Sequence, residues 1–219
     1  MCLRAPKMFH HIDVIELPHS STIHRSLWPV QWACDNIPCE CSFNLTYSVR
    51  DSAVHASVTL LNARSDQTEY GARDQELPAV YVNGFLYRLM AYTGDQPWTG
   101  QPLEEFQAGF DSFWVPGRIS PTESFVAFAA ADDFAVGVYN AAPEVSSFLA
   151  GFSGAKGSGG TSDAATGYMA PIAQLALPWD AVYTYNYVLA MGALADVRAY
   201  VYQLHASGDE AKAGGGSNG

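Results

Sequence analysis

Residues 43–49 read Phe-Asn-Leu-Thr-Tyr-Ser-Val, and residues 54–60 read Val-His-Ala-Ser-Val-Thr-Leu. In both stretches apolar side chains alternate with polar ones, and Arg-Asp-Ser at residues 50–52 separates them. Successive side chains of a β-strand point to opposite faces, so this alternation predicts two half-buried strands joined as a hairpin. The stretch therefore predicts an antiparallel sheet with one apolar face.

Further runs rich in β-branched and aromatic residues follow along the chain, most of them bounded by turn-forming residues. Many short strands separated by turns are typical of an antiparallel sandwich or barrel. Apolar residues then recur at helical spacing over residues 193–205, which predicts one C-terminal helix that caps the sheet. The predicted fold class is mainly β, an antiparallel β-sandwich with one C-terminal helix. The further predicted strands are residues 79–82, 85–92, 123–130, 134–139, 147–152, 168–177 and 182–189.

The 219 residues fit one all-β domain better than two small ones. Residues 1–27 mix charges, two prolines and four histidines without a sustained period, so they are predicted to be an irregular lead-in or the remnant of an upstream segment. Residues 28–205 are predicted to form the β-sandwich domain with its helix. Residues 206–219 are rich in glycine and have nothing to bury, which predicts a disordered tail.

The net charge is -11, from 22 acidic and 11 basic residues. This charge repels phosphate backbones and anionic lipid surfaces, so neither nucleic acid nor a membrane is expected as a partner. No apolar run approaches the roughly 20 residues that span a bilayer, and the first residues do not form the apolar region of a signal peptide. The fingerprints of nucleotide-binding loops are absent, and no cofactor is predicted.

Four cysteines lie at positions 2, 34, 39 and 41, and three of them fall within eight residues. Three alternatives remain open: a soft metal bound with nearby histidines, a disulfide among Cys34, Cys39 and Cys41, or unpaired thiols. The spacing matches no common zinc pattern, so no metal ligand is assigned.

The densest cluster of reactive polar groups spans residues 62–76, in a chain with only 15% charged residues. Glu76 precedes the predicted strand 79–82, and partial burial at such a strand entrance would suit a carboxylate to general acid or base work. Arg73 is placed with Glu76 in the catalytic set, while Arg64 and Gln75 are predicted to bind substrate. In the alternative interpretation, the arginines and carboxylates form ion pairs that pin a long connection to the sheet.

Glu123, at the start of the predicted strand 123–130, is a second candidate catalytic carboxylate, since sugar chemistry often uses two facing carboxyl groups. Taken alone, it is also consistent with a solvated residue at a strand end. The ring faces of Trp and Tyr stack on the C–H faces of sugars. Tyr81, Trp98 and Tyr168 lie near predicted loops or strand ends, so they are predicted to line a substrate cleft.

Residues 31–41, 73–92, 166–171 and 196–202 together resemble a group of largely uncharacterised bacterial proteins, typically longer and exported, with residues 75–81 as the most specific part. The resemblance implies an extracellular or periplasmic location and a chain that is truncated at its N-terminus. The strand pattern is in turn similar to the β-supersandwich of aldose epimerases such as galactose mutarotase. Aldose epimerases rely on a histidine and a late-strand carboxylate. The late strands here offer Asp180 and no histidine, which departs from that pattern.

The sequence therefore supports two functional hypotheses. The first is a carbohydrate-binding or polysaccharide-processing β-sandwich protein with a Glu/Arg polar cleft; as an enzyme it would be a glycoside hydrolase, a lyase or epimerase-like. The second is a non-catalytic adhesion or interaction module in which the polar cluster is structural. The oligomeric state is not predicted.

Overall fold

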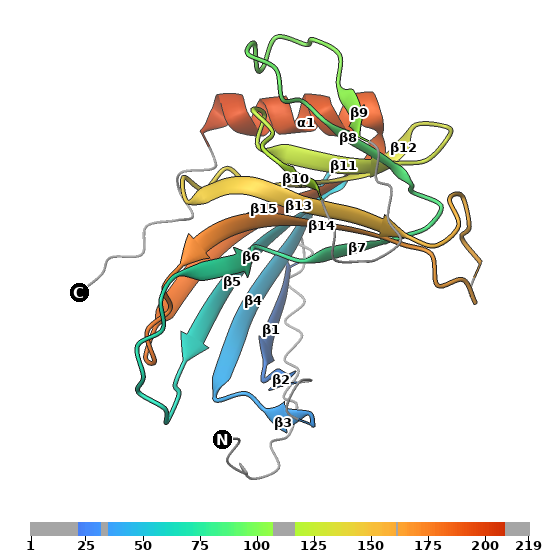
Figure 1. Ribbon diagram of the computed structural model, residues 1–219. Helices are drawn as coiled ribbons and strands as arrows, with labels where there is room; N and C mark the ends of the chain where they lie inside the picture. The colour runs from blue at the N-terminus through green and yellow to red at the C-terminus, as the bar shows by residue number, and fades with distance from the viewer. Residues whose placement is uncertain (1–21, 32–34, 107–116, 161, 209–219) are drawn as a thin grey trace.

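The computed structural model describes residues 22–31, 35–106, 117–160 and 162–208, which form two large antiparallel sheets, one small sheet and one helix (Figure 1). The eight-stranded sheet contains, in spatial order, β1 (Thr22–Leu27), β4 (Cys41–Arg50), β5 (Ala53–Asn62), β15 (Val182–Ala193), β12 (Phe134–Tyr139), β11 (Phe125–Ala129), β8 (Arg88–Ala91) and β9 (Glu104–Phe106). The five-stranded sheet contains β10 (Gly117–Ile119), β13 (Val145–Ser153), β14 (Thr166–Leu175), β6 (Arg73–Glu76) and β7 (Val80–Asn83). The small sheet pairs β2 (Val30–Gln31) with β3 (Ile37–Pro38). The predicted fold class, a mainly β antiparallel sandwich with one C-terminal helix, is confirmed.

The predicted hairpin forms as strands β4 and β5, in a register that places Tyr47 opposite Ala56 and Val49 opposite Val54. Asp51 in the turn adopts a φ of 52°, a left-handed conformation that Asp tolerates better than most residues. Strand β15 pairs along the other side of β5 and adds Tyr187 opposite Ala56 on the same face. The apolar face that the alternation predicted therefore continues across three strands.

Two cores lie on either side of the eight-stranded sheet. Val126 and Phe128 of β11 pack with Phe148 and Met169 of the five-stranded sheet. Phe125, Ala127 and Ala129, which alternate with them along β11, face the opposite way, toward the helix. The helix, the eight-stranded sheet and the five-stranded sheet thus form three layers (Figure 1).

Helix α1 (Leu194–Ser207) follows β15 without a loop and buries Val197, Val201 and Leu204 against the sheet. It ends at Gly208, whose φ of 62° is the left-handed conformation that commonly terminates helices. The helix was predicted over residues 193–205, and it extends two residues into the predicted tail; residues 209–219 lie outside the described residues. No helix within the described ranges has the length and apolar character needed to cross a membrane.

Residues 1–27 were predicted to be an irregular lead-in or the remnant of an upstream segment. Of these, Thr22–Leu27 is not irregular but forms strand β1, which pairs with β4. Its outward side chains bind their neighbours: His24 Nδ1 lies 2.9 Å from Thr46 Oγ1, and Ser26 Oγ donates to Asn44 Oδ1 at 2.8 Å. The charged Arg25 interrupts the apolar alternation of this strand, which hid it in the sequence. Residues 1–21 lie outside the described residues.

Strands β6 and β7 both pair with β14, and a cis peptide bond between Leu77 and Pro78 separates them. Leu77 is buried, its N–H donates to Pro171 O at 2.9 Å, and its carbonyl accepts Asn140 Nδ2 at 2.8 Å. Glu76 is therefore the last residue of β6 and not the entrance to the predicted strand 79–82. The Arg-Asp-Gln-Glu strand is entirely polar, so no apolar pattern marked it.

We expect Asn140→Ala to lower the free energy of unfolding by about 2 kcal/mol, because it leaves buried partners unsatisfied. Asn140 is 2% exposed, and it also accepts the N–H of Ala142 at 3.0 Å. Urea denaturation measures the effect. The matched control is Asn83→Ala, an exposed asparagine that accepts the N–H of Phe85, for which we expect a smaller loss; equal losses would contradict the role given to Asn140.

Candidate functional site

Glu76 and Tyr168 form a hydrogen-bonded pair on the five-stranded sheet. Tyr168 Oη donates to Glu76 Oε1 at 2.5 Å. Burial of Tyr168, followed by its hydrogen bond to Glu76, raises the pKa of Tyr168 far above its ordinary value. The phenol therefore remains protonated and donates to the carboxylate throughout the physiological pH range.

The pair faces away from the core between the two sheets. Met169 points into that core, so strand alternation places Tyr168, Ala170 and Ile172 on the opposite face, where they form a separate apolar cluster with Leu149. We call this the outer face of the five-stranded sheet.

Tyr81 lies directly opposite Tyr168 in the register between β7 and β14. The two ring centroids are 5.3 Å apart, with an interplanar angle of 52°. Tyr81 is 59% exposed, whereas Tyr168 is 5% exposed. The outer face therefore presents an accessible aromatic ring beside a carboxylate and a buried phenol.

Arg118 extends this arrangement across the outer face. It lies on β10, and its guanidinium donates to Ser147 Oγ of β13 at 2.7 Å and to the carboxylate of Asp74 on β6. The hydrogen bond from Arg118 holds the pKa of Asp74 below its usual range. Since β10 and β6 are separated by β13 and β14 in the sheet, the guanidinium links its two sides.

Sequence reasoning missed Asp74, Arg118 and Ser147 as site residues. Asp74 stands two residues before Glu76, a spacing that places both carboxylates on one face of a strand about 7 Å apart. That spacing was a usable signal once a strand was suspected. Arg118 carried no local signal, since it reaches Asp74 across 44 positions of the chain.

Arg64, Arg73 and Gln75 do not join the outer face. Alternation within β6 places Arg73 and Gln75 on the opposite side from Glu76. The guanidinium carbons of Arg64 and Arg73 lie 4.6 and 5.3 Å from the centroid of the Tyr70 ring. The two arginines therefore contact the connection between β5 and β6 through the Tyr70 ring.

Glu123, the second predicted carboxylate, is wholly buried at 0% exposure. Arg198 donates to both of its oxygens, from Nη2 at 2.8 Å and from Nε at 2.9 Å. Tyr202 Oη at 2.6 Å and the N–H of Trp98 at 3.0 Å also donate to Oε1. Burial alone would raise the pKa of Glu123, but the bonds from Arg198, Tyr202 and Trp98 outweigh it and lower the pKa.

This geometry corrects the prediction that Glu123 and Trp98 share a cleft with Glu76. Arg198 and Tyr202 belong to helix α1, which packs on the side of the eight-stranded sheet turned away from the five-stranded sheet. Both sheets therefore lie between Glu123 and the outer face. The Trp98 ring instead stacks on His205, with centroids 3.8 Å apart and an angle of 7°.

An open groove of about 630 Å³ lies on the helix side of the molecule. Arg88, at one of its walls, pairs with Asp133 at 2.6 Å and with Glu105 at 3.0 Å, so its charge is balanced locally. Sequence reasoning singled out no residue of this groove apart from the helix itself. The groove is lined by Arg88, Met90, Leu103, Asp133, Ala193, Leu194, Ala195, Arg198, Ala199 and Tyr202.

Of the three alternatives for the cysteines, the structure has the disulfide, between Cys39 and Cys41. Cys2 and Cys34 lie outside the described residues. Across the described part of the chain, no three His, Cys, Asp or Glu side chains gather in a way that could hold a metal ion.

Comparisons with known proteins identify no family. No protein-family model matches the chain, and no curated protein matches it. Among solved structures, the chain is similar to the crystal structure of the Slr1438 protein from Synechocystis sp. PCC 6803, with a TM-score of 0.46 and 6% sequence identity. The similarity covers 84% of this chain and 66% of that chain. The resemblance to exported bacterial proteins and to aldose epimerases stays a prediction.

We expect Arg198→Leu to lower the free energy of unfolding by about 3 kcal/mol, because it leaves the buried carboxylate of Glu123 without a cationic partner. Chemical denaturation measures the loss. Arg118→Leu is the matched control, since its pair with Asp74 is substantially exposed and such pairs contribute at most about 1 kcal/mol. A loss no larger for Arg198→Leu than for Arg118→Leu would show that Glu123 does not depend on this partner.

The lowered pKa of Glu123 also predicts a pH dependence. A carboxyl group whose pKa is lower in the folded state stabilises the fold above its unfolded value, ordinarily 4.5, and this contribution is lost as the pH falls further. Wild-type protein should therefore exceed Glu123→Gln in free energy of unfolding by the largest margin near neutral pH. The margin should shrink below about pH 4.5, as measured by urea denaturation across pH. A margin that does not change with pH would contradict the assignment.

Proposed function

We propose that the protein binds a neutral carbohydrate on the outer face of the five-stranded sheet. The observation that carries the proposal is the exposed ring of Tyr81 beside the hydrogen-bonded pair of Tyr168 and Glu76.

The chemistry of the three side chains suits a sugar ring. The face of Tyr81 offers the stacking surface that the C–H faces of sugars prefer. An ionised carboxylate has two oxygens with about four acceptor sites, and Tyr168 occupies one of them on Glu76. The remaining sites can accept hydroxyl groups of a sugar stacked on Tyr81.

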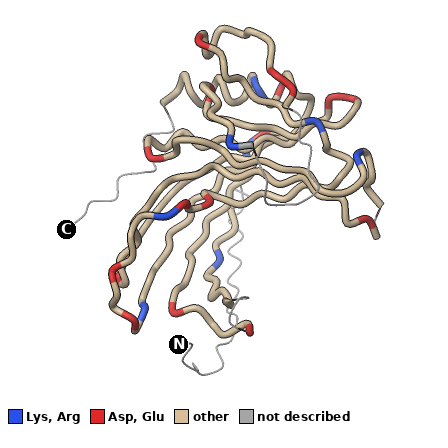
Figure 2. The backbone as a smooth tube through the Cα atoms, viewed as in Figure 1, with Lys and Arg blue, Asp and Glu red and all other residues tan. Residues whose placement is uncertain are grey.

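The local charge favours a neutral sugar over an acidic one. Arg118 is balanced by Asp74, while the hydrogen-bond partner of Glu76 is an uncharged phenol. Most of the long strands carry no charged residue, and acidic residues outnumber basic ones along the chain (Figure 2). An anionic sugar would therefore meet net repulsion at this face.

The geometry supports binding without cleavage. Glycosidases place two carboxyl groups on either side of the scissile bond. Glu123 cannot supply the second group, because it is inaccessible and both of its oxygens are hydrogen-bonded. Asp74, the other carboxylate of the outer face, accepts a hydrogen bond from Arg118 that lowers its pKa, so it is a weaker base than an ordinary carboxylate.

We expect Tyr81→Ala to weaken sugar binding about tenfold, because the stacking surface is lost. An array of neutral oligosaccharides identifies the strongest binder, and calorimetric titration of that sugar measures the affinity of each variant. Phe134→Ala is the matched control, since Phe134 is an aromatic residue 45% exposed on β12 of the other sheet. An array without a binder, or equal losses for both variants, would refute the proposal.

The variant Glu76→Gln separates carbohydrate binding from the alternative interaction module. If the carboxylate accepts sugar hydroxyls, the affinity falls with little change in stability. If the Tyr168–Glu76 pair only fastens β6 to β14, binding remains intact and the free energy of unfolding falls.

A further inference from the structure

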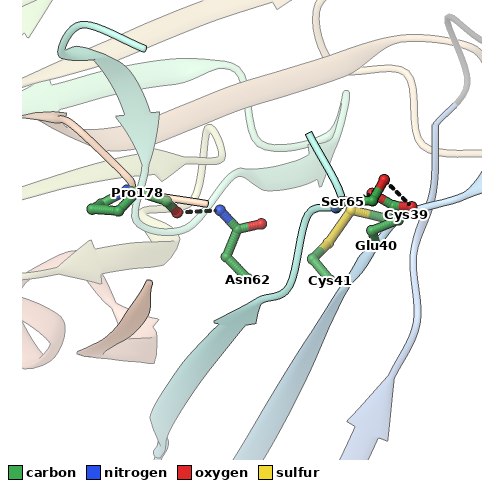
Figure 3. The surroundings of a disulfide bond; sticks show 6 residues. All are labelled: Cys39, Glu40, Cys41, Asn62, Ser65 and Pro178. Atoms are coloured by element: carbon green, nitrogen blue, oxygen red, sulfur yellow. Dashed lines mark hydrogen bonds between the residues drawn. A yellow bond between two sulfur atoms is a disulfide. The ribbon is translucent and has the colours of Figure 1, made fainter. Parts of the chain in front are cut away.

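The Cys39–Cys41 disulfide lies beside a small latch formed by Glu40 and Ser65 (Figure 3). The Glu40 carboxylate accepts the Ser65 N–H at 2.7 Å and the Ser65 hydroxyl at 2.8 and 2.9 Å. The carbonyl of Glu40 also accepts the N–H of Ala63 at 2.9 Å. Glu40 is therefore tied to the start of the connection between β5 and β6 through both its backbone and its side chain.

These bonds matter because residues 63–72 are held mainly by polar contacts. Nearly all of these residues are exposed, so little apolar burial stabilises them. Asp66 accepts the N–H of Thr68 at 2.9 Å and the hydroxyl of Tyr70 at 2.6 Å. The hydrogen bonds from Thr68 and Tyr70 lower the pKa of Asp66 to about 2, so it stays ionised and accepts both bonds at neutral pH.

The contacts continue along the connection to the edge strand of the five-stranded sheet. Arg64 lies over the Tyr70 ring and 3.6 Å from Asp66 Oδ2. Arg73, the first residue of β6, lies over the same ring. An unbroken series of contacts therefore leads from the disulfide through Ser65 and Tyr70 to β6.

We propose that Cys39–Cys41 is a reversible redox modification site, reduced by a dithiol, and that its opening loosens residues 63–72. The thiolate of the dithiol attacks one sulfur, the Cys39–Cys41 bond breaks, and a mixed disulfide forms with release of the other cysteine as a thiol. The second thiol of the reductant then attacks the mixed disulfide and releases the cysteine that was bound to the reductant. The products are two cysteine thiols and the oxidised dithiol in its disulfide form.

The surroundings of the disulfide favour reversible reduction over a purely stabilising role. Cys39 and Cys41 are both only partly buried, which gives a reductant access. They are two positions apart, and the stabilisation from closing a disulfide loop grows with loop length, so the global fold gains little from this one. The local gain is larger, because the closed ring restricts the backbone of Glu40. Opening the ring restores the conformational freedom of Glu40 and makes its alignment with Ser65 more costly.

The test uses the full chain with Cys2→Ser and Cys34→Ser, so that only the Cys39–Cys41 pair reacts. The protein is treated with dithiothreitol without denaturant, alkylated and mapped by peptide mass spectrometry. Hydrogen–deuterium exchange of residues 63–72 is compared before and after reduction. We expect both cysteines to be alkylated and exchange at the connection to quicken about tenfold, while β11 and β12 keep their protection.

Two variants isolate the latch. Cys39→Ser with Cys41→Ser should show the fast exchange without reductant and no further change with it. Ser65→Ala, with the disulfide intact, should quicken exchange by itself, so that reduction then adds less than it does in the parent protein. These measurements require no sugar, so they stand or fall apart from the proposed function.

Three results would overturn the proposal: a pair that resists the dithiol in the folded protein, reduction that leaves exchange at residues 63–72 unchanged, or reduction that also removes protection from β11 and β12. The last would show that the disulfide supports the whole fold and is no local switch.

Discussion

The burial of both faces of β11 is the constraint on which the rest of the structure depends. All five of its residues are buried, with Val126 and Phe128 in the core between the sheets and Phe125 in the core beneath the helix. A strand covered on both sides needs a layer on each side, so the five-stranded sheet and the helix are both required. The neighbouring strand β12 meets the same requirement with Gly137, where a Cβ atom would come within 2.9 Å of Val197 on the helix.

The buried ion pair of Glu123 and Arg198 fixes how the helix sits on this strand. Glu123 stands two residues before β11, and its partners Arg198 and Tyr202 come from one side of the helix. A carboxylate without solvent requires such partners, because an unpaired buried charge is very costly. Glu123, which the sequence suggested as a catalytic group, therefore holds the start of β11 and helix α1 together.

The alternation of side chains along β14 determines which residues lie on the outer face. Because Met169 fills the core between the sheets, Tyr168 must point outward, and the pairing of β6 and β7 with β14 brings Glu76 and Tyr81 beside it. A register shift of one residue would reverse these faces. The site is thus set by the packing of the core, while its polar edge is continuous with the connection that begins beside the Cys39–Cys41 disulfide.

The sequence by itself determined the elements whose pattern is local. Alternation specified the β4–β5 hairpin, and helical spacing specified α1, because each pattern reflects burial on one side. It also brought Glu76, Tyr81 and Tyr168 to attention by residue type.

Only the tertiary structure decided which of these polar residues meet. Arg118 donates a hydrogen bond to Asp74 from a distant strand, and Glu123 accepts one from Arg198, 75 positions away in the sequence. Such contacts depend on strand order and sheet packing, which no local period records, and so the sequence could not separate the buried carboxylate from the exposed one.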